Sequence, residues 1–177
     1  MKTNGIIRRI DSLGRIVIPI HMRKELNLFE NDNVELLIQD KEILVRKYSS
    51  LKGSGEIYSK ITESIYKSIG GTIVIVDEEQ ILSSYGEKRN LYKPLLNISS
   101  NLKMRFEKEF DVLKENYILV NTIEEDYNLL VPIKGPMGKR IGAIIHIYKG
   151  NLLENNRTLI NSYAIFIEEM LKWYEIR

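Results

Sequence analysis

The first part of the chain alternates short β-branched runs with turn-forming polar residues. Residues 5–10 and 15–18 are rich in isoleucine and valine, and residues 11–14 between them have the composition of a turn. This pattern predicts a β-hairpin. Pro19 cannot donate a hydrogen bond to a strand ladder, but it suits the first turn of a helix. We therefore expect the second strand to end there and a short helix to cover about 20–27.

A second hairpin is predicted after this helix. The runs 34–38 and 42–46 are apolar-rich and flank turn-forming residues at 39–41. The result is a ββαββ unit of about 48 residues, which is too small to bury a stable core without a metal or a disulfide. Its short apolar strands need a partner for their edges and faces. A symmetric dimer would supply that partner.

The only Gly/Ser-rich stretch of the chain, 49–55, predicts a domain boundary. We expect an N-terminal domain at 1–50, a linker at 51–55 and a C-terminal domain at 56–177.

The C-terminal region combines amphipathic helix patterns with buried-strand patterns. The predicted helices lie at 56–69, at about 93–115 with a break in the middle, and at about 155–174, and the predicted strands lie at 72–76, 81–85, 117–121, 127–133 and 141–148. This order describes an α+β architecture, an antiparallel sheet of five or six strands with flanking helices on one face.

The last predicted helix carries an apolar seam at spacings of four and three residues. Its members are Leu159, Tyr163, Phe166, Met170 and Trp173, widened by Ile160, Ile167 and Tyr174. A stripe of this width is typical of a helix that packs on its own sheet and also on a second chain.

Charge is distributed unevenly along the chain. Residues 1–24 contain six basic residues and one acid, residues 25–47 contain three basic residues and six acids, and residues 48–177 contain 17 of each. The net charge of +2 therefore comes from the first 24 residues. A polyanion is the partner that this asymmetry favours, and a solvated charged face is the alternative.

Composition excludes several classes of function. The chain has no cysteine and only two histidines, so disulfides, thiolate sites and the common zinc sites are excluded. No apolar run reaches the ~18–20 residues that span a bilayer, and the N-terminus lacks a signal-peptide pattern. The sequence also contains no nucleotide-binding loop and no catalytic triad order. We expect a cytoplasmic protein that is not an enzyme, holds no metal or cofactor and binds no membrane.

The segment 5–26, GIIRRIDSLGRIVIPIHMRKEL, resembles the AbrB-type swapped-hairpin DNA-binding domain. The match covers about 47 residues, and its charges, its turn, its Gly-Arg pair and its Ile-Pro stop fall in register. The family implies a homodimer in which the hairpins of two chains interleave. It also implies that the basic side chains here contact double-stranded DNA, namely Lys2, Arg8, Arg9, Arg15, Arg23 and Lys24.

Other polar residues of this segment have structural interpretations. Asp11 is expected to cap the turn by accepting backbone N–H bonds, and Gly14 to give the turn its backbone freedom. His21 departs from the charged residue expected at its position, and we interpret it as an exposed helix residue. The acids of residues 25–42 are expected to form a solvated face turned away from DNA rather than a metal site, because their spacing lacks a calcium-loop pattern.

The layout of the whole chain is similar to sporulation regulators that join this domain to a C-terminal GAF-like domain. The segment 132–143 is similar to paired strands of a GAF domain. The resemblance implies a homotetramer built through C-terminal helices, and sensing of an unidentified small-molecule effector. Five tyrosines are candidates to line a pocket, with ordinary packing as the alternative: Tyr85, Tyr92, Tyr117, Tyr127 and Tyr148. His146 lies within a predicted strand, where a hydrogen-bonded or exposed histidine is expected.

These observations predict a nucleoid-associated transcription regulator, an activator or a repressor of sporulation-stage genes, with sequence-preferring DNA binding. The alternative is an antitoxin-type DNA-binding protein that senses no ligand. Such antitoxins end in short toxin-wrapping tails, whereas about 120 residues of patterned sequence follow the first domain here. A signalling enzyme is not favoured, because the catalytic residues it would need are missing.

Overall fold

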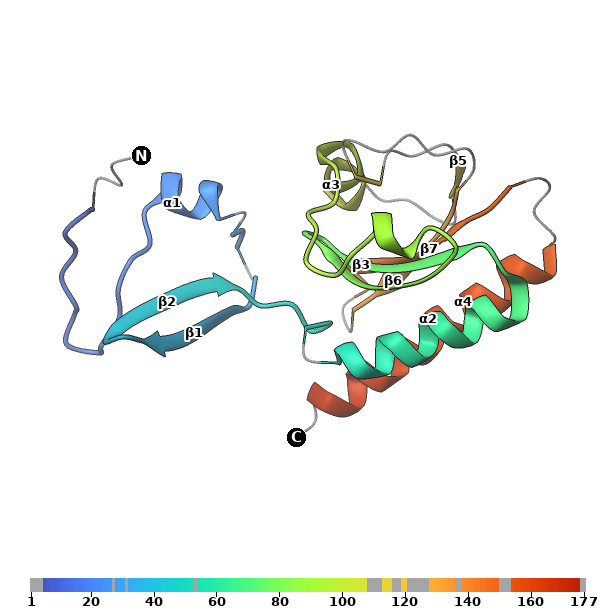
Figure 1. The fold of residues 1–177 in the computed structure, drawn as a ribbon. Coiled ribbons are helices and arrows are strands. Elements are labelled where there is room, and N and C mark those ends of the chain that lie inside the picture. The colour runs from blue at the N-terminus through green and yellow to red at the C-terminus, as the bar shows by residue number, and fades with distance from the viewer. Residues whose placement is uncertain are drawn as a thin grey trace. The chain divides into compact units, whose positions relative to one another are not determined.

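The computed structural model describes residues 5–26, 28–30, 32–52, 54–107, 113–115, 119–120, 128–135, 138–149 and 154–175 (Figure 1). The chain divides into two compact units, Met1–Tyr48 and Ser49–Arg177. We call the first the head unit and the second the C-terminal unit, and each is described by itself. Among the described residues, no helix is both long enough and apolar enough to cross a bilayer.

The head unit contains one short helix and one hairpin. Helix α1 (Ile20–Glu25) follows Pro19, and strands β1 (Val34–Gln39) and β2 (Glu42–Lys47) pair antiparallel in a single register. The turn between the strands places two residues at positive φ, which matches the right-handed twist of the strands that it joins. The predicted second hairpin is confirmed.

The predicted first hairpin is only partly confirmed. Its turn forms at residues 11–14, but the arms 5–10 and 15–19 belong to no sheet of this chain. The two arms separate beyond the turn (Figure 1). The physical reason is that an isolated two-stranded ribbon is marginal in water, since its apolar faces have nothing to cover them. In the described part of the head unit, Leu28 is the only buried hydrophobic side chain.

The C-terminal unit is built on a five-stranded antiparallel sheet. In chain order, its strands are β3 (Thr72–Asp77), β4 (Ile81–Gly86), β5 (Leu113–Glu115), β6 (Asn128–Lys134) and β7 (Arg140–Ile147). Their spatial order is β4-β3-β7-β6-β5. The helical elements are α2 (Gly55–Ile69), η1 (Arg89–Leu91), α3 (Ser100–Glu107) and α4 (Glu154–Glu175). The α+β architecture with an antiparallel sheet is confirmed.

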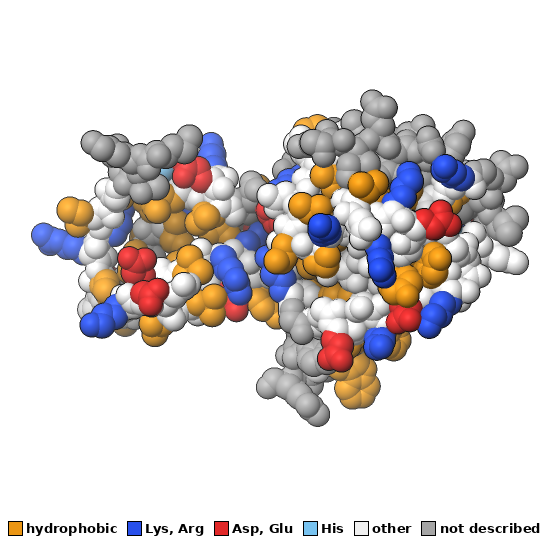
Figure 2. Space-filling model, viewed as in Figure 1, with side chains coloured by type: hydrophobic (Ala, Val, Ile, Leu, Met, Phe, Trp, Pro, Cys, Tyr) orange, Lys and Arg blue, Asp and Glu red, His pale blue; other side chains and the backbone are white. Residues whose placement is uncertain are grey.

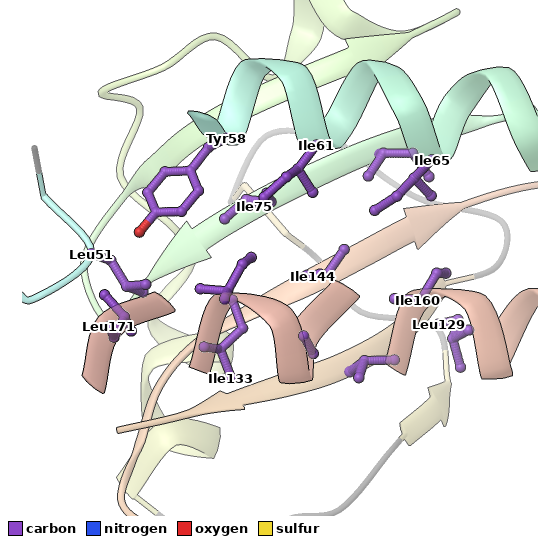
Figure 3. Packing of buried hydrophobic residues seen from close by; sticks show 14 of the residues in the cluster. Leu51, Tyr58, Ile61, Ile65, Ile75, Leu129, Ile133, Ile144, Ile160 and Leu171 are labelled. Carbon is purple, nitrogen blue, oxygen red and sulfur yellow. The ribbon is translucent and has the colours of Figure 1, made fainter. Parts of the chain in front are cut away.

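The helices cover both faces of this sheet, so the prediction of helices on one face was wrong. Helices α2 and α4 lie side by side on one face (Figures 1 and 3) and bury Tyr58, Ile65 and Ile167 against β3, β6 and β7. The opposite face is covered by α3 and the segment before it, with Leu102 and Phe106 in a second buried cluster. Every residue of β3 is buried as a result.

The predicted helix at 93–115 is much shorter in the structure. It occupies Ser100–Glu107, and β5 begins at Leu113, earlier than the strand predicted at 117–121. Pro94 disfavours helical backbone at the residue before it. The Ser99 hydroxyl accepts the N–H of Leu102 at 3.0 Å, which is the hydrogen bond of a helix N-cap. The helix therefore cannot begin where its apolar pattern begins.

The apolar seam of α4 is offset from the face that the helix buries. The sheet covers Ile160, Ala164, Ile167 and Leu171. Of the predicted seam residues, Tyr163 and Met170 are partly buried against this core, whereas Phe166 is 54 % and Trp173 76 % exposed. The seam is thus a flank of the helix with a covered inner edge and an open outer edge.

His146 is buried in the middle of β7, which contradicts the expectation of a hydrogen-bonded or exposed histidine. Neither ring nitrogen has a hydrogen-bond partner. Gly71 lies against the ring, and a Cβ at Gly71 would be 2.7 Å from Nε2. Burial lowers the pKa of His146 to about 4, and the backbone of Gly70 opposes this shift without cancelling it.

This histidine predicts acid sensitivity of the C-terminal unit. A pKa of about 4 when folded, against about 6.5 when unfolded, means that the unfolded chain binds the extra proton between these pH values. The free energy of unfolding should therefore fall from about pH 6.5 to pH 4, by up to roughly 3 kcal/mol. Urea unfolding of the full-length protein, followed by circular dichroism, measures this slope. His146→Leu should remove most of it, and an unchanged slope in this variant would refute the assignment.

Candidate nucleic-acid interface

The turn of the first hairpin is organised by one carboxylate. Asp11 Oδ1 accepts the N–H groups of Leu13 at 2.9 Å and Arg15 at 2.8 Å, and the Asp11 N–H donates to the carbonyl of Arg15 at 3.1 Å. Gly14 has a φ of 77°, in the left-handed region that glycine adopts without strain. The structural roles predicted for Asp11 and Gly14 are confirmed.

The same carboxylate orients the guanidinium of Arg15. Arg15 Nε donates to Asp11 Oδ2 at 2.8 Å, while the Arg15 side chain stays 72 % exposed. Hydrogen bonds from the backbone and the side chain of Arg15 lower the pKa of Asp11, so the pair remains charged over a wide pH range. The pair is solvated and adds little stability. Its consequence is positional, because it restricts the direction in which the guanidinium points.

The other predicted contact residues lie on two neighbouring segments. Arg8 and Arg9 are exposed on the arm before the turn. Arg23 and Lys24 lie in the last turn of α1, where Lys24 is exposed and Arg23 half-buried. The Nε of Arg23 is buried and has no hydrogen-bond partner among the described residues. Lys2 lies outside the described residues.

These side chains share no single element in one chain. We call the five described cations the basic set: Arg8, Arg9, Arg15, Arg23 and Lys24. They come from an unpaired arm, a turn and a short helix. The turn is well defined, but nothing within one chain joins the arms into the rigid ribbon that the resemblance implies.

Acidic residues of the head unit are partly engaged with bases on β2. Arg46 Nε donates to Glu35 Oε2 at 2.7 Å across the hairpin, and Lys47 Nζ lies 3.4 Å from Asp32 Oδ2. Both pairs bring the acids to the β1–β2 hairpin, away from the turn that carries Arg15. Among the described residues, no group of three potential ligands could hold a metal ion.

Exposed hydrophobic side chains are the feature of the head unit that sequence patterns indicated only in general terms. Ile7 is 94 %, Ile38 86 % and Val17 75 % exposed. Figure 2 shows hydrophobic side chains spread over the visible surface of this unit. An isolated domain rarely leaves so many large apolar groups in water. The head unit is thus an incomplete fold that presents a surface for another chain.

The candidate tyrosines of the C-terminal unit do not converge on one pocket. Tyr92 is buried on the α3 face of the sheet, and Tyr148 is buried on the face covered by α2 and α4. Tyr85 lies against Tyr66 of α2, with ring centroids 5.3 Å apart. Tyr117 and Tyr127 lie outside the described residues. Ordinary packing, the alternative interpretation, accounts for the three tyrosines that are described.

The comparisons with known proteins agree on the N-terminal domain. Residues 7–52 match the family model described as antidote-toxin recognition MazE, bacterial antitoxin. The transition state regulatory protein AbrB of Bacillus subtilis (strain 168) is 36 % identical over 85 residues, which cover 47 % of this chain and 88 % of that protein.

Two further similarities extend into the rest of the chain. The type II free methionine-R-sulfoxide reductase from Thermoplasma acidophilum has a similar fold, with a TM-score of 0.51 over 67 % of this chain and 92 % of that chain. At 13 % identity this likeness concerns the fold alone. Stage V sporulation protein T of Bacillus subtilis (strain 168) is 34 % identical over 182 residues, 97 % of this chain and 99 % of that protein. The chain therefore belongs to the family of stage V sporulation protein T.

Proposed function

We propose that this protein is a sequence-preferring, DNA-binding transcription regulator of sporulation-stage genes, acting as an activator or a repressor. The observation that carries the proposal is its similarity to stage V sporulation protein T over nearly the full length of both chains. The similarity to a transition state regulator over the head unit supports the same function. The proposed site of action is the cytoplasm, on the nucleoid, and no catalytic activity is part of the proposal.

Dimerisation of the head unit through interleaved hairpins is the first step of the proposed mechanism. The arms 5–10 and 15–19 belong to no sheet of their own chain, yet they flank a fully formed turn. Large apolar side chains on the arms and on β1 and β2 lie exposed. Two copies that exchange arms would pair these segments and bury these side chains together.

DNA recognition would follow from the same exchange. Once paired, the arms form ribbons that hold the arginines at fixed spacing, doubled across a two-fold axis. A guanidinium makes bidentate contacts with phosphates and with guanine edges, whereas a lysine acts as a point charge. Lys2 would extend the basic set defined above. The buried and unpartnered Nε of Arg23 supports a completed interface in this region, since such donors normally find an acceptor.

A direct test of the proposed function is selection from a random duplex library by the full-length protein. A regulator with sequence preference enriches a short motif over successive rounds. Genomic fragments that co-precipitate with the protein during sporulation should contain the same motif. Failure to enrich any sequence, combined with salt-insensitive retention of DNA, would contradict the proposal.

Assembly through the C-terminal unit is the second part of the proposal. The outer edge of α4 exposes Phe166 and Trp173, and the stripe continues inward to Tyr163, whose hydroxyl is 2.7 Å from Ser64 Oγ of α2. We propose that this edge pairs with the same edge of a second copy. Because the head units dimerise by another surface, a homotetramer would result.

The double variant Phe166→Glu/Trp173→Glu should reduce a tetramer to a dimer. Both side chains are exposed within one chain, so the fold of the C-terminal unit should survive, whereas two buried charges in each half of an interface would cost several kcal/mol. Light scattering coupled to gel filtration measures the mass. Asn161→Glu, which adds a charge on another side of the same helix, should leave the mass unchanged. An unchanged mass in the double variant would contradict assembly through α4.

Sensing of a small molecule by a GAF-like C-terminal domain is the third part. It is supported by the resemblance of the sequence and by Tyr92, a buried side chain on the α3 face whose hydroxyl has no hydrogen-bond partner among the described residues. A bound molecule or a buried water would satisfy this group. Thermal-shift screening of metabolites against the wild type and Tyr92→Phe tests this role.

A second candidate function is that of an antitoxin without ligand sensing. It is favoured by the description of the family model that matches residues 7–52. A small toxin that co-purifies with the protein and releases its DNA would support this function. The observation against it is that the similarity to the sporulation protein extends through the whole C-terminal unit.

A further inference from the structure

The segment that follows β2 is anchored in the C-terminal unit rather than free. The N–H of Lys52 donates to the carbonyl of Ser49 at 3.0 Å, which closes a turn. The side chain of Leu51 is 1 % exposed and lies in the core beside Tyr58 and Leu171 (Figure 3). A buried leucine holds this turn on the C-terminal unit by the same apolar contacts that hold the helices.

A second contact ties the segment to the end of β3. The hydroxyl of Ser49 donates to Asp77 Oδ2 at 3.3 Å. The other carboxylate oxygen accepts the N–H groups of Glu79 at 2.8 Å and Gln80 at 2.7 Å, which fixes Asp77 in the β3–β4 turn. Burial raises the pKa of Asp77, while the N–H groups of Gln80 and Glu79 act in the opposite direction. We call Ser49, Leu51 and Asp77 the anchor.

The adjacent strand β7 is shaped to receive the anchor. Gly142 lies opposite Asp77 in the β3–β7 register. A Cβ at Gly142 would come within 2.5 Å of Leu51 Cδ1 and within 2.4 Å of the Val76 carbonyl. Glycine at this position therefore leaves the space that the Leu51 side chain occupies, so strands β3 and β7 both meet the anchor.

The head unit ends immediately before this segment. The N–H of Tyr48 donates to the carbonyl of Asn33 at 2.9 Å, so the backbone of Tyr48 is still held within the head unit. Ser49 already belongs to the C-terminal unit. A free Gly/Ser linker of seven residues would let its ends move over roughly 15 Å. Between Tyr48 and the anchor, only a few backbone torsions remain.

We propose that the anchor positions the DNA-binding head, so that each head leaves the C-terminal unit at a fixed point with almost no slack. The separation of two heads in an assembly is then set by the C-terminal units, and DNA sites at matching separation are preferred. A rearrangement of β3 or β7 would reach the head through Asp77 and Leu51. The link to DNA rests on the proposed function, whereas the anchor itself rests on the contacts above.

Two insertions of the same length separate a restrained joint from a flexible linker. Gly-Ser-Gly inserted between Tyr48 and Ser49 leaves the anchor intact but lengthens the joint. The same insertion between Lys52 and Gly53 lies beyond the anchor and leaves the joint as it is. A dye on Glu42→Cys labels the head uniquely, because the chain has no other cysteine. Time-resolved fluorescence anisotropy of full-length protein reports the motion of the head.

We expect one slow decay for the labelled parent protein and for the insertion after Lys52. The insertion after Tyr48 should add a fast component of nanoseconds. Leu51→Ser should add the same component, and the conservative Leu51→Met should restore the slow decay, which a general loss of stability would not do. A fast component in the parent protein, or equal decays for the two insertions, would overturn the proposal.

DNA binding provides the second readout. Duplexes carrying two copies of the selected motif at varied separation should be bound by the parent protein with at least a tenfold preference for one separation. The insertion after Tyr48 should abolish this preference and leave affinity for a single motif within about twofold. Equal separation dependence for both insertions would overturn the positioning role. Absence of DNA binding in every protein would instead refute the proposed function, and the anisotropy decays would still decide the anchor.

Discussion

Replacing Arg15 with alanine is expected to weaken DNA binding of the full-length protein by at least about tenfold. A dimer presents this side chain twice, so one substitution removes two guanidinium contacts. At about 1–3 kcal/mol for each lost contact, even the lower bound gives a thirtyfold loss, and tenfold allows for partial compensation by neighbours. The dimer should stay folded, because the Arg15 side chain is largely exposed and its pair with Asp11 is solvated.

The measurement is a fluorescence-anisotropy titration of a duplex at several salt concentrations. A head dimer carries the five cations of the basic set twice. If about half of them neutralise phosphates, affinity should fall as roughly the fourth to fifth power of salt, and Arg15→Ala should reduce this exponent. Lys41→Ala, in the turn between β1 and β2, is the matched control and should bind almost normally.

Asp11→Asn separates orientation of Arg15 from formation of the turn. Asparagine retains the oxygen that accepts the N–H groups of Leu13 and Arg15, but it replaces with an amide the oxygen that accepts Arg15 Nε. We expect a loss smaller than that of Arg15→Ala and an unchanged thermal stability. If both variants bound like the wild type, the N-terminal charge would be only a solvated face and the proposed interface would be wrong.

The elements that sequence patterns predicted best have a strong local signal. The helix at 56–69 and the helix at 155–174 are observed within one residue of these ends, and the hairpins around 39–41 and 77–80 are observed as predicted. Each combines a clear apolar period with turn-forming residues at its ends. The carboxylate and the glycine of the 11–14 turn belong to the same group, because their roles depend only on residues nearby in the chain.

The elements that were mispredicted depend on contacts far away in the chain or on another chain. The arms 5–10 and 15–18 have strand composition, but strand pairing needs a partner that the single chain does not provide. The region 93–115 has a helical pattern that Pro94 and the Ser99 cap shorten. A second covered sheet face could not be read from a period-two pattern, because β3 is apolar on both sides.

The candidate interface was predicted as a set of residue types, and its geometry was not. The cluster of arginines in the first 24 residues follows from counting charges. The Arg15–Asp11 hydrogen bond could have been anticipated only from the turn, because these residues are four apart around a left-handed glycine. The anchor had no sequence signal, since Leu51 lies in a stretch whose composition is typical of a free linker.

Ile16→Asp is expected to abolish head dimerisation and, with it, DNA binding. Side chains alternate along a strand, so if Arg15 faces DNA then Ile16 faces the interleaved core. Ile16 is 51 % exposed within one chain, so the substitution would cost little if the head unit functioned alone. In a dimer it buries two unpaired carboxylates, and at ~3–5 kcal/mol in total the dissociation constant rises by a few hundredfold or more. Sedimentation of residues 1–52 at micromolar concentration measures this. The wild-type fragment should be a folded dimer, Gln39→Asp should remain one, and Ile16→Asp should be an unfolded monomer. A wild-type fragment that sediments as a folded monomer, or a variant that dimerises normally, would contradict the interleaved head.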